Sequence, residues 1–115
     1  MKLYGVRIFV DDFARAVEFY GGTLGLATNW SMQDMKAAGF SVETAELIVE
    51  EASGDDAGLV GRFAGASLQV NDIDATWRRL TEAGVTFDQA PEKQPWGGTL
   101  AHFRDPAGNV LTLLG

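Results

Sequence analysis

The chain of 115 residues contains no cysteine. This absence excludes a disulfide scaffold, a zinc site with thiolate ligands and catalysis by a cysteine nucleophile. No apolar run approaches the ~18 residues that a membrane-spanning helix needs, and the N-terminus runs directly into a strand-like pattern without a leader-like apolar segment. We therefore expect a cytoplasmic protein that has no membrane as a partner.

Positive charge is also scarce, with nine Lys and Arg residues against 16 Asp and Glu residues and a net charge of −7. This balance argues against nucleic acid as a partner. Residues 1–58 hold four basic and ten acidic side chains, whereas residues 59–115 hold five and six. Six acids and no base lie between Glu43 and Asp56. This acidic segment is either a solubilising surface or a field that attracts a cationic ligand.

Turn-forming residues and alternating apolar residues divide the first half of the chain into short elements. Asp12 is placed to cap a helix over residues 13–20, and Gly21-Gly22 is placed to end it. Four strands surround this helix in the order expected from period-two alternation, over residues 3–10, 26–31, 36–42 and 45–50. Residues 1–52 therefore form a first βαβββ module.

The same order of elements returns after a Gly- and Asp-rich linker over residues 53–62. A shift of 60 residues aligns Gly5 with Gly65 and Asp12 with Asp72, together with several apolar positions. The expected elements of residues 63–115 are a strand over 63–70, a helix over 73–83, a strand over 85–89, a loop over 91–98 and a hairpin over 99–104 and 109–114. The chain is thus predicted to be one α+β domain of two βαβββ modules.

Several short motifs also carry a family resemblance. They are Val10-Asp11-Asp12, Arg15-Ala16, Phe19-Tyr20 and Leu24-Gly25-Leu26, then Val70-Asn71-Asp72-Ile73-Asp74 and Phe103-Arg104-Asp105-Pro106-Ala107-Gly108-Asn109. With these motifs the chain resembles the vicinal oxygen chelate superfamily, which holds glyoxalase I, extradiol dioxygenases and the bleomycin-resistance proteins. The resemblance implies curved mixed sheets around a cavity, and a homodimer whose cavities are built from both chains.

The resemblance also implies where metal ligands would stand in a metal-dependent relative. Those positions are Gly5, Gly65, Thr112 and a place near Ile48. Glycine has no side chain, and a lone threonine hydroxyl does not hold a divalent ion without imidazole or carboxylate ligands. We therefore expect no metal and no other cofactor, and we favour a binding protein over an enzyme.

Strand side chains alternate between faces, and this alternation predicts which of them line the cavity. If Gly5 faces the cavity, Arg7 and Phe9 share its face, while Ile8 and Val10 pack toward the helices. The same rule and the loop aromatics give the full predicted set of ligand-binding residues: Arg7, Phe9, Trp30, Glu46, Ile48, Ser67, Gln69, Trp96, Leu100, His102 and Thr112. Such a mixture of apolar walls and a few polar groups is typical of a small-molecule site.

Some of these residues have a plainer interpretation. His102, the only histidine, is either a ligand-binding group or a partly exposed strand residue. Arg7 is expected to form an ion pair with Glu46 or Glu50, and Arg104 to brace Asp105. Trp30 and Trp96 either stack on a planar or cationic ligand or pack their loops onto the core.

The leading hypothesis is a metal-independent protein of the bleomycin-resistance type that sequesters a small, planar or cationic organic molecule, such as an antibiotic. A second hypothesis is a lyase, isomerase or dioxygenase with displaced metal ligands, for which His102, Glu46 and Glu50 would have to cluster. A third is a scaffold or regulatory module with a vestigial pocket, filled by Phe9, Trp30 and Leu100.

Overall fold

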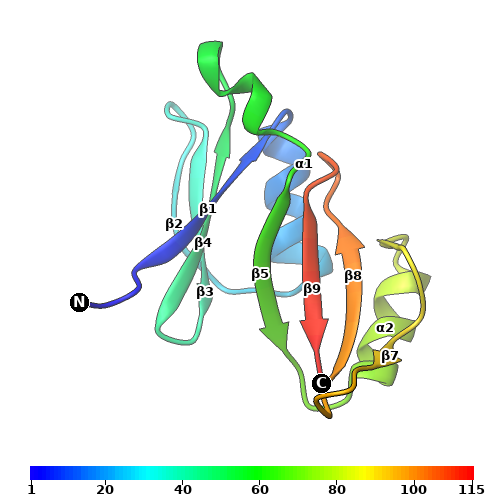
Figure 1. Cartoon of the computed structure of the whole chain (residues 1–115). Helices are drawn as coiled ribbons and strands as arrows, with labels where there is room; N and C mark the ends of the chain where they lie inside the picture. The colour runs from blue at the N-terminus through cyan, green and yellow to red at the C-terminus, as the bar shows by residue number, and fades with distance from the viewer.

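The computed structural model describes all residues 1–115, and they fold into two β-sheets that lie side by side with α1 behind them (Figure 1). Sheet A has the strand order β1-β4-β3-β2, in which only the β1–β4 pair is parallel. Its strands are β1 (Gly5–Val10), β2 (Thr28–Met32), β3 (Ala37–Val42) and β4 (Ala45–Glu51).

Sheet B repeats this order with β5, β9, β8 and β6, and again only the first pair is parallel. Its strands are β5 (Phe63–Gln69), β6 (Thr86–Phe87), β8 (Thr99–Arg104) and β9 (Val110–Leu114), with β7 (Glu92–Lys93) pairing to the other end of β8. The predicted α+β class and the two-module architecture are therefore confirmed. The strand expected over 85–89 is shorter, and the expected loop over 91–98 contains β7.

Both main helices begin where the sequence predicts them. The Asp12 carboxylate accepts a hydrogen bond from the Arg15 amide at 3.1 Å and caps α1 (Phe13–Val17), which continues as a π-helical turn, η1 (Glu18–Thr23). Asp72 caps α2 (Ile73–Glu82) in the same way, from the Ala75 amide at 3.0 Å. The linker contains one further element, the 3-10 helix η2 (Gly54–Leu59). None of these helices has the length and apolarity needed to cross a membrane.

One hydrophobic core joins the two modules on the helix side of the sheets. Ile8 and Val10 of β1 and Leu47 and Val49 of β4 are buried toward the helices, as the alternation predicts. From the second module, Phe103, Leu111 and Leu113 enter the same cluster of 18 buried side chains. Because only one face of each sheet is covered in this way, each sheet keeps a second, open face.

A buried polar network closes the seam between the modules. The Asn109 side-chain oxygen accepts hydrogen bonds from the Gly61 and Arg62 amides at 2.9 and 3.0 Å, and its amide group donates to the Phe9 carbonyl at 2.8 Å. Asn109 also donates to the Asp105 carboxylate at 2.9 Å. One side chain thus ties the last hairpin to the linker and to β1, which no short-range sequence pattern indicates.

Asp105 is not braced by Arg104, so that prediction was wrong. Its carboxylate turns inward and accepts a hydrogen bond from the Tyr20 hydroxyl at 2.8 Å, while Arg104 turns outward to Asp88 at 3.3 Å. Burial and the neighbouring Asp105 carboxylate raise the pKa of Tyr20 far above its ordinary value. Tyr20 therefore stays a neutral hydrogen-bond donor that holds α1–η1 to the second module.

Candidate functional site

The open face of sheet A carries a broad cavity of about 520 Å³. It lies over the middle of β1, β4, β3 and β2, because side chains opposite one another in the strand register project to the same side. The lining residues, most of them apolar, are Arg7, Trp30, Met32, Met35, Ala37, Ile48 and Glu50. The cavity thus has an apolar floor with a charged pair at its edge, which suits an organic ligand with an aromatic body.

The indole of Trp30 lies against β3 at Gly39, its partner in the strand register. A Cβ atom at position 39 would overlap the indole Nε1 atom and lie 2.7 Å from Cε2. The glycine therefore leaves the space in which the ring lies against the sheet. The ring is half-buried and lines the cavity.

Glu46 fixes the polar edge of that indole. Its carboxylate accepts hydrogen bonds from the Trp30 Nε1 at 3.1 Å and from the Asn29 side-chain amide at 2.7 Å. The side chain is largely buried, with 9% of its surface exposed. The hydrogen bonds from Asn29 and Trp30 hold the pKa of Glu46 below its ordinary value, and the neighbouring Tyr4 hydroxyl acts in the same direction. Glu46 is therefore an ionised carboxylate whose hydrogen-bond partners are all neutral.

Arg7 and Glu50 form the predicted ion pair at the edge of the cavity. The guanidinium donates to both carboxylate oxygens of Glu50, at 2.6 and 3.1 Å, and its carbon atom lies 5.3 Å from the centre of the Phe9 ring. The bidentate contact balances the charge of Glu50. Of the two carboxylates that the sequence places on this face, only Glu46 is without a cationic partner.

The positions implied for metal ligands have structural roles of their own. A Cβ atom at Gly5 would lie 2.6 Å from the Glu46 carbonyl oxygen across the parallel strand pair. Gly65 has φ of +73°, in an irregular stretch of β5 between Phe63 and Ser67. Thr112 shares a 2.8 Å hydrogen bond with the Nδ1 atom of His102. No group of three or more His, Asp or Glu side chains lies close enough to hold a metal ion.

The remaining predicted residues lie on the second module. Register pairing places Ser67, Thr112 and His102 side by side across β5, β9 and β8, and Gln69 and Leu100 flank Leu114 in the next row. The Phe63 ring meets His102 edge-on at 6.0 Å between ring centres. Within one chain, the cavity on sheet A is lined only by residues of the first module, and the cavity of about 230 Å³ beside His102 only by residues of the second.

Trp96 stands apart from both cavities. It is 66% exposed, and its ring lies over Gly98 in the turn before β8. Two methionines that line the cavity on sheet A, Met32 and Met35, were not predicted from the sequence. Neither were Asn29 and Gly39, which hold Glu46 and the Trp30 ring in place. A glycine inside a strand pattern was the available signal, since it indicates that another group approaches the backbone closely.

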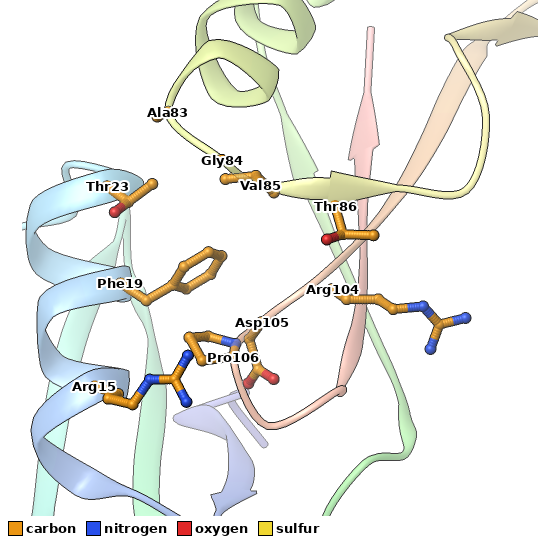
Figure 2. A pocket seen from close by; sticks show the side chains of 10 residues that line it. All are labelled: Arg15, Phe19, Thr23, Ala83, Gly84, Val85, Thr86, Arg104, Asp105 and Pro106. Carbon is orange, nitrogen blue, oxygen red and sulfur yellow. The ribbon is translucent and has the colours of Figure 1, made fainter.

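A further cavity, of about 290 Å³, lies on the helix side at the seam between the modules (Figure 2). Thr23 and Phe19 of η1 face the turn between α2 and β6 across it, with Pro106 at its lower end. Figure 2 shows the Arg104 side chain pointing away from this space. Arg15 is the basic side chain that points into this cavity, and few of the lining residues are apolar. The cavity is therefore a weaker candidate for an organic ligand than the face of sheet A.

Comparison with known proteins identifies the family to which the chain belongs. Residues 3–113 match the Glyoxalase/Bleomycin resistance protein/Dioxygenase superfamily, and the chain belongs to that superfamily. Among curated relatives it is 34% identical to the uncharacterised protein YraH of Bacillus subtilis, over 98% of this chain and 97% of YraH.

Solved structures agree with this assignment. A superfamily member from Sphaerobacter thermophilus is 32% identical, covers 99% of this chain and 96% of its own, and superposes with a TM-score of 0.83. TnmS3, an antibiotic binding protein from Streptomyces, is 28% identical over 98% of this chain and 93% of its own, with a TM-score of 0.82. A lactoylglutathione lyase from Agrobacterium tumefaciens, at 20% identity and a TM-score of 0.78, shares the fold.

Proposed function

We propose that the protein binds and sequesters a planar organic molecule on the open face of sheet A, without a metal ion. The observation that carries this proposal is the apolar floor of about 520 Å³ beside the oriented indole of Trp30. Burial and stacking on such a surface supply binding energy that does not depend on a Lewis acid. The likeness to TnmS3, an antibiotic binding protein, supports an antibiotic as the kind of molecule bound.

The metal-ligand positions favour binding over metal-dependent catalysis. An imidazole at position 5 would require β1 to move away from β4, since even a Cβ atom there is too close to the Glu46 carbonyl. Glu46 and Glu50 are engaged by Trp30 and Arg7, and neither has a hydrogen bond to His102. The open cavity also differs from the filled pocket that a scaffold with a vestigial site would have.

We further propose that the protein works as a homodimer in which sheet B of one chain covers sheet A of the other. The isolated chain exposes 6922 Å², whereas a compact monomer of 12.4 kDa is expected to expose about 6,100 Å². The surplus includes large apolar side chains on both open faces, with Met32 48%, Met35 67% and Phe63 64% exposed. In such a pair, the partner's His102, Thr112, Ser67, Gln69 and Leu100 would roof the cavity.

Tryptophan fluorescence during titration with a panel of planar aromatic drugs tests the binding proposal, with EDTA present throughout. We expect saturable binding that Trp30→Phe weakens by about fivefold, the range expected for one aromatic contact. Trp77→Phe, the same change in the half-buried tryptophan of α2, serves as the matched control and should leave affinity unchanged. Absence of saturable binding across the panel, or equal losses in both variants, would contradict the proposal.

Sedimentation analysis tests the homodimer separately. The expected mass is twice the 12.4 kDa of one chain, and Met35→Glu should shift the population toward monomer by placing a charge on the covered face. A monomer at all accessible concentrations would contradict this part of the proposal. It would leave the binding face of sheet A to be tested on its own.

A further inference from the structure

The indole of Trp30 is held as a fixed platform on the floor of the sheet A cavity. Gly39 leaves room for the N–H edge of the ring against β3, since a Cβ atom there would overlap the indole nitrogen and lie 2.7 Å from Cε2. The N–H group itself donates to Glu46, and Trp30 lines the cavity. A ligand in the cavity therefore meets the carbon ring system of the indole and not its N–H group.

That N–H group is bound to an anion. The Trp30 Nε1 donates to Glu46 at 3.1 Å, and Asn29 donates to the second oxygen of the same carboxylate at 2.7 Å. The carboxylate is largely buried and has no cationic partner. A donor bound to an ionised acceptor in a partly desolvated site is polarised, so electron density shifts into the ring and its face becomes more negative.

The other carboxylates of β4 do not supply this effect. Glu50 is neutralised by Arg7 through two contacts, at 2.6 and 3.1 Å. Glu51 binds Lys36 at 3.2 Å and accepts from the Phe13 amide, away from the cavity. Glu46, beside the indole, is thus the one carboxylate of β4 whose charge no cation balances.

We propose that the Glu46–Trp30 pair makes the cavity on sheet A selective for planar cations, with Glu46 as a positioning residue that acts through the indole. This inference rests on the proposed function, in which a planar molecule lies against Trp30. Cation–π attraction is strongest at tryptophan and grows as the site is desolvated. Neutral and charged rings of one shape bury the same apolar area on this surface, so a preference for the cation requires the cation–π attraction to exceed the cost of desolvating the charge.

The test compares two probes of nearly equal shape, N-methylacridinium and acridine, at a pH at which acridine is neutral. Binding of each is titrated to the wild-type chain, to Glu46→Gln and to Glu43→Gln. Glu46→Gln keeps an oxygen that accepts from the indole but removes the charge. Glu43→Gln makes the same change at an exposed turn of the acidic segment and controls for the general field. Circular dichroism checks that each variant is folded.

We expect the wild-type chain to prefer the cation by about fivefold. Glu46→Gln should abolish that preference by weakening cation binding alone, and Glu43→Gln should retain it. A merely structural role of Glu46 would instead weaken both probes together. If Glu46→Gln does not fold, Trp30→Phe removes the polarised donor and should likewise abolish the preference.

Three results would overturn the inference. Equal binding of both probes to the wild-type chain, with loss of both in Trp30→Phe, would reject charge selectivity and leave the proposed function intact. If the preference for the cation survives in Glu46→Gln, a group other than Glu46 causes it. If neither probe binds the wild-type chain while other planar drugs of the panel do, this inference fails and the proposed function stands; if no member of the panel binds, both fail.

Discussion

The open faces of the two sheets are built by the same order of elements, yet they present different chemistry. Sheet A offers an indole, two methionines and an isoleucine beside a carboxylate without a cationic partner. Sheet B offers a histidine bound to a threonine, with the exposed ring of Phe63 beside it and Ser67 and Gln69 further along β5. On the helix side both modules place apolar residues at matching positions. The two modules therefore share the apolar positions that pack against the helices. They differ at the positions on the open faces of the sheets, where a ligand or a partner would bind.

The largest effect is expected when the hydrogen bonds that join the two modules are removed. Asn109→Ala removes the partners of the Gly61 and Arg62 amides and of the Phe9 carbonyl, all in part-buried surroundings. We expect a loss of about 3 kcal/mol in the free energy of unfolding, since each unsatisfied buried group costs about 1–3 kcal/mol. Urea denaturation measures it, with the exposed Asn71→Ala as control. A loss no larger than that of the control would contradict the role of Asn109.

The two glycines at equivalent positions of the modules, Gly5 and Gly65, are expected to differ in what an added side chain costs. Gly5→Ala places a Cβ atom 2.6 Å from a carbonyl oxygen, so β1 must shift, and we expect a cost of about 2 kcal/mol. Gly65→Ala would place its Cβ atom in ordinary contact with the Phe63 ring at 3.8 Å, but φ is +73°, so it should cost about 1 kcal/mol. Thermal unfolding of both variants measures the costs. The reverse order would show that conformational strain outweighs the close approach.

Binding distinguishes the two faces directly. Trp30→Ala removes the platform on sheet A and should lower affinity for a planar aromatic drug by about tenfold. In the proposed dimer His102 belongs to the roof of the cavity. His102→Ala should therefore lower the affinity for the same drug by about threefold. Isothermal titration with the same drug measures both. A larger loss in His102→Ala would place the main contacts on sheet B.

The smallest effect is a pH dependence that belongs to sheet A alone. The folded chain lowers the pKa of Glu46, so its stabilising contribution is present above the unfolded value of about 4.3 and is lost as the pH falls below it. Wild type should therefore be more stable than Glu46→Gln near neutral pH, and the gap should close in acid. A gap that is independent of pH would contradict an ionised, hydrogen-bonded Glu46.

The sequence predicts the fold well because strand alternation, capping aspartates and the repeat are local signals. Asp12 and Asp72 cap helices, and Ile8 and Val10 face the core. The site is predicted less completely because its shape depends on contacts between strands. Only register pairing brings Gly39 beneath Trp30, and only a turn brings Met35 into the wall. Arg104 was misassigned because proximity in sequence to Asp105 does not determine where either side chain points.

Nuclear magnetic resonance of the 115-residue chain, titrated with N-methylacridinium in the presence of EDTA, shows directly whether sheet A binds a planar cation. Each of the three tryptophans supplies one indole N–H group as a probe. We expect the Trp30 signal to shift in a saturable way, together with the backbone amides of Gly39 and Ile48, while the Trp77 signal stays unchanged. Saturable shifts confined to the helix side, or no saturable shift at Trp30, would contradict a binding face on sheet A.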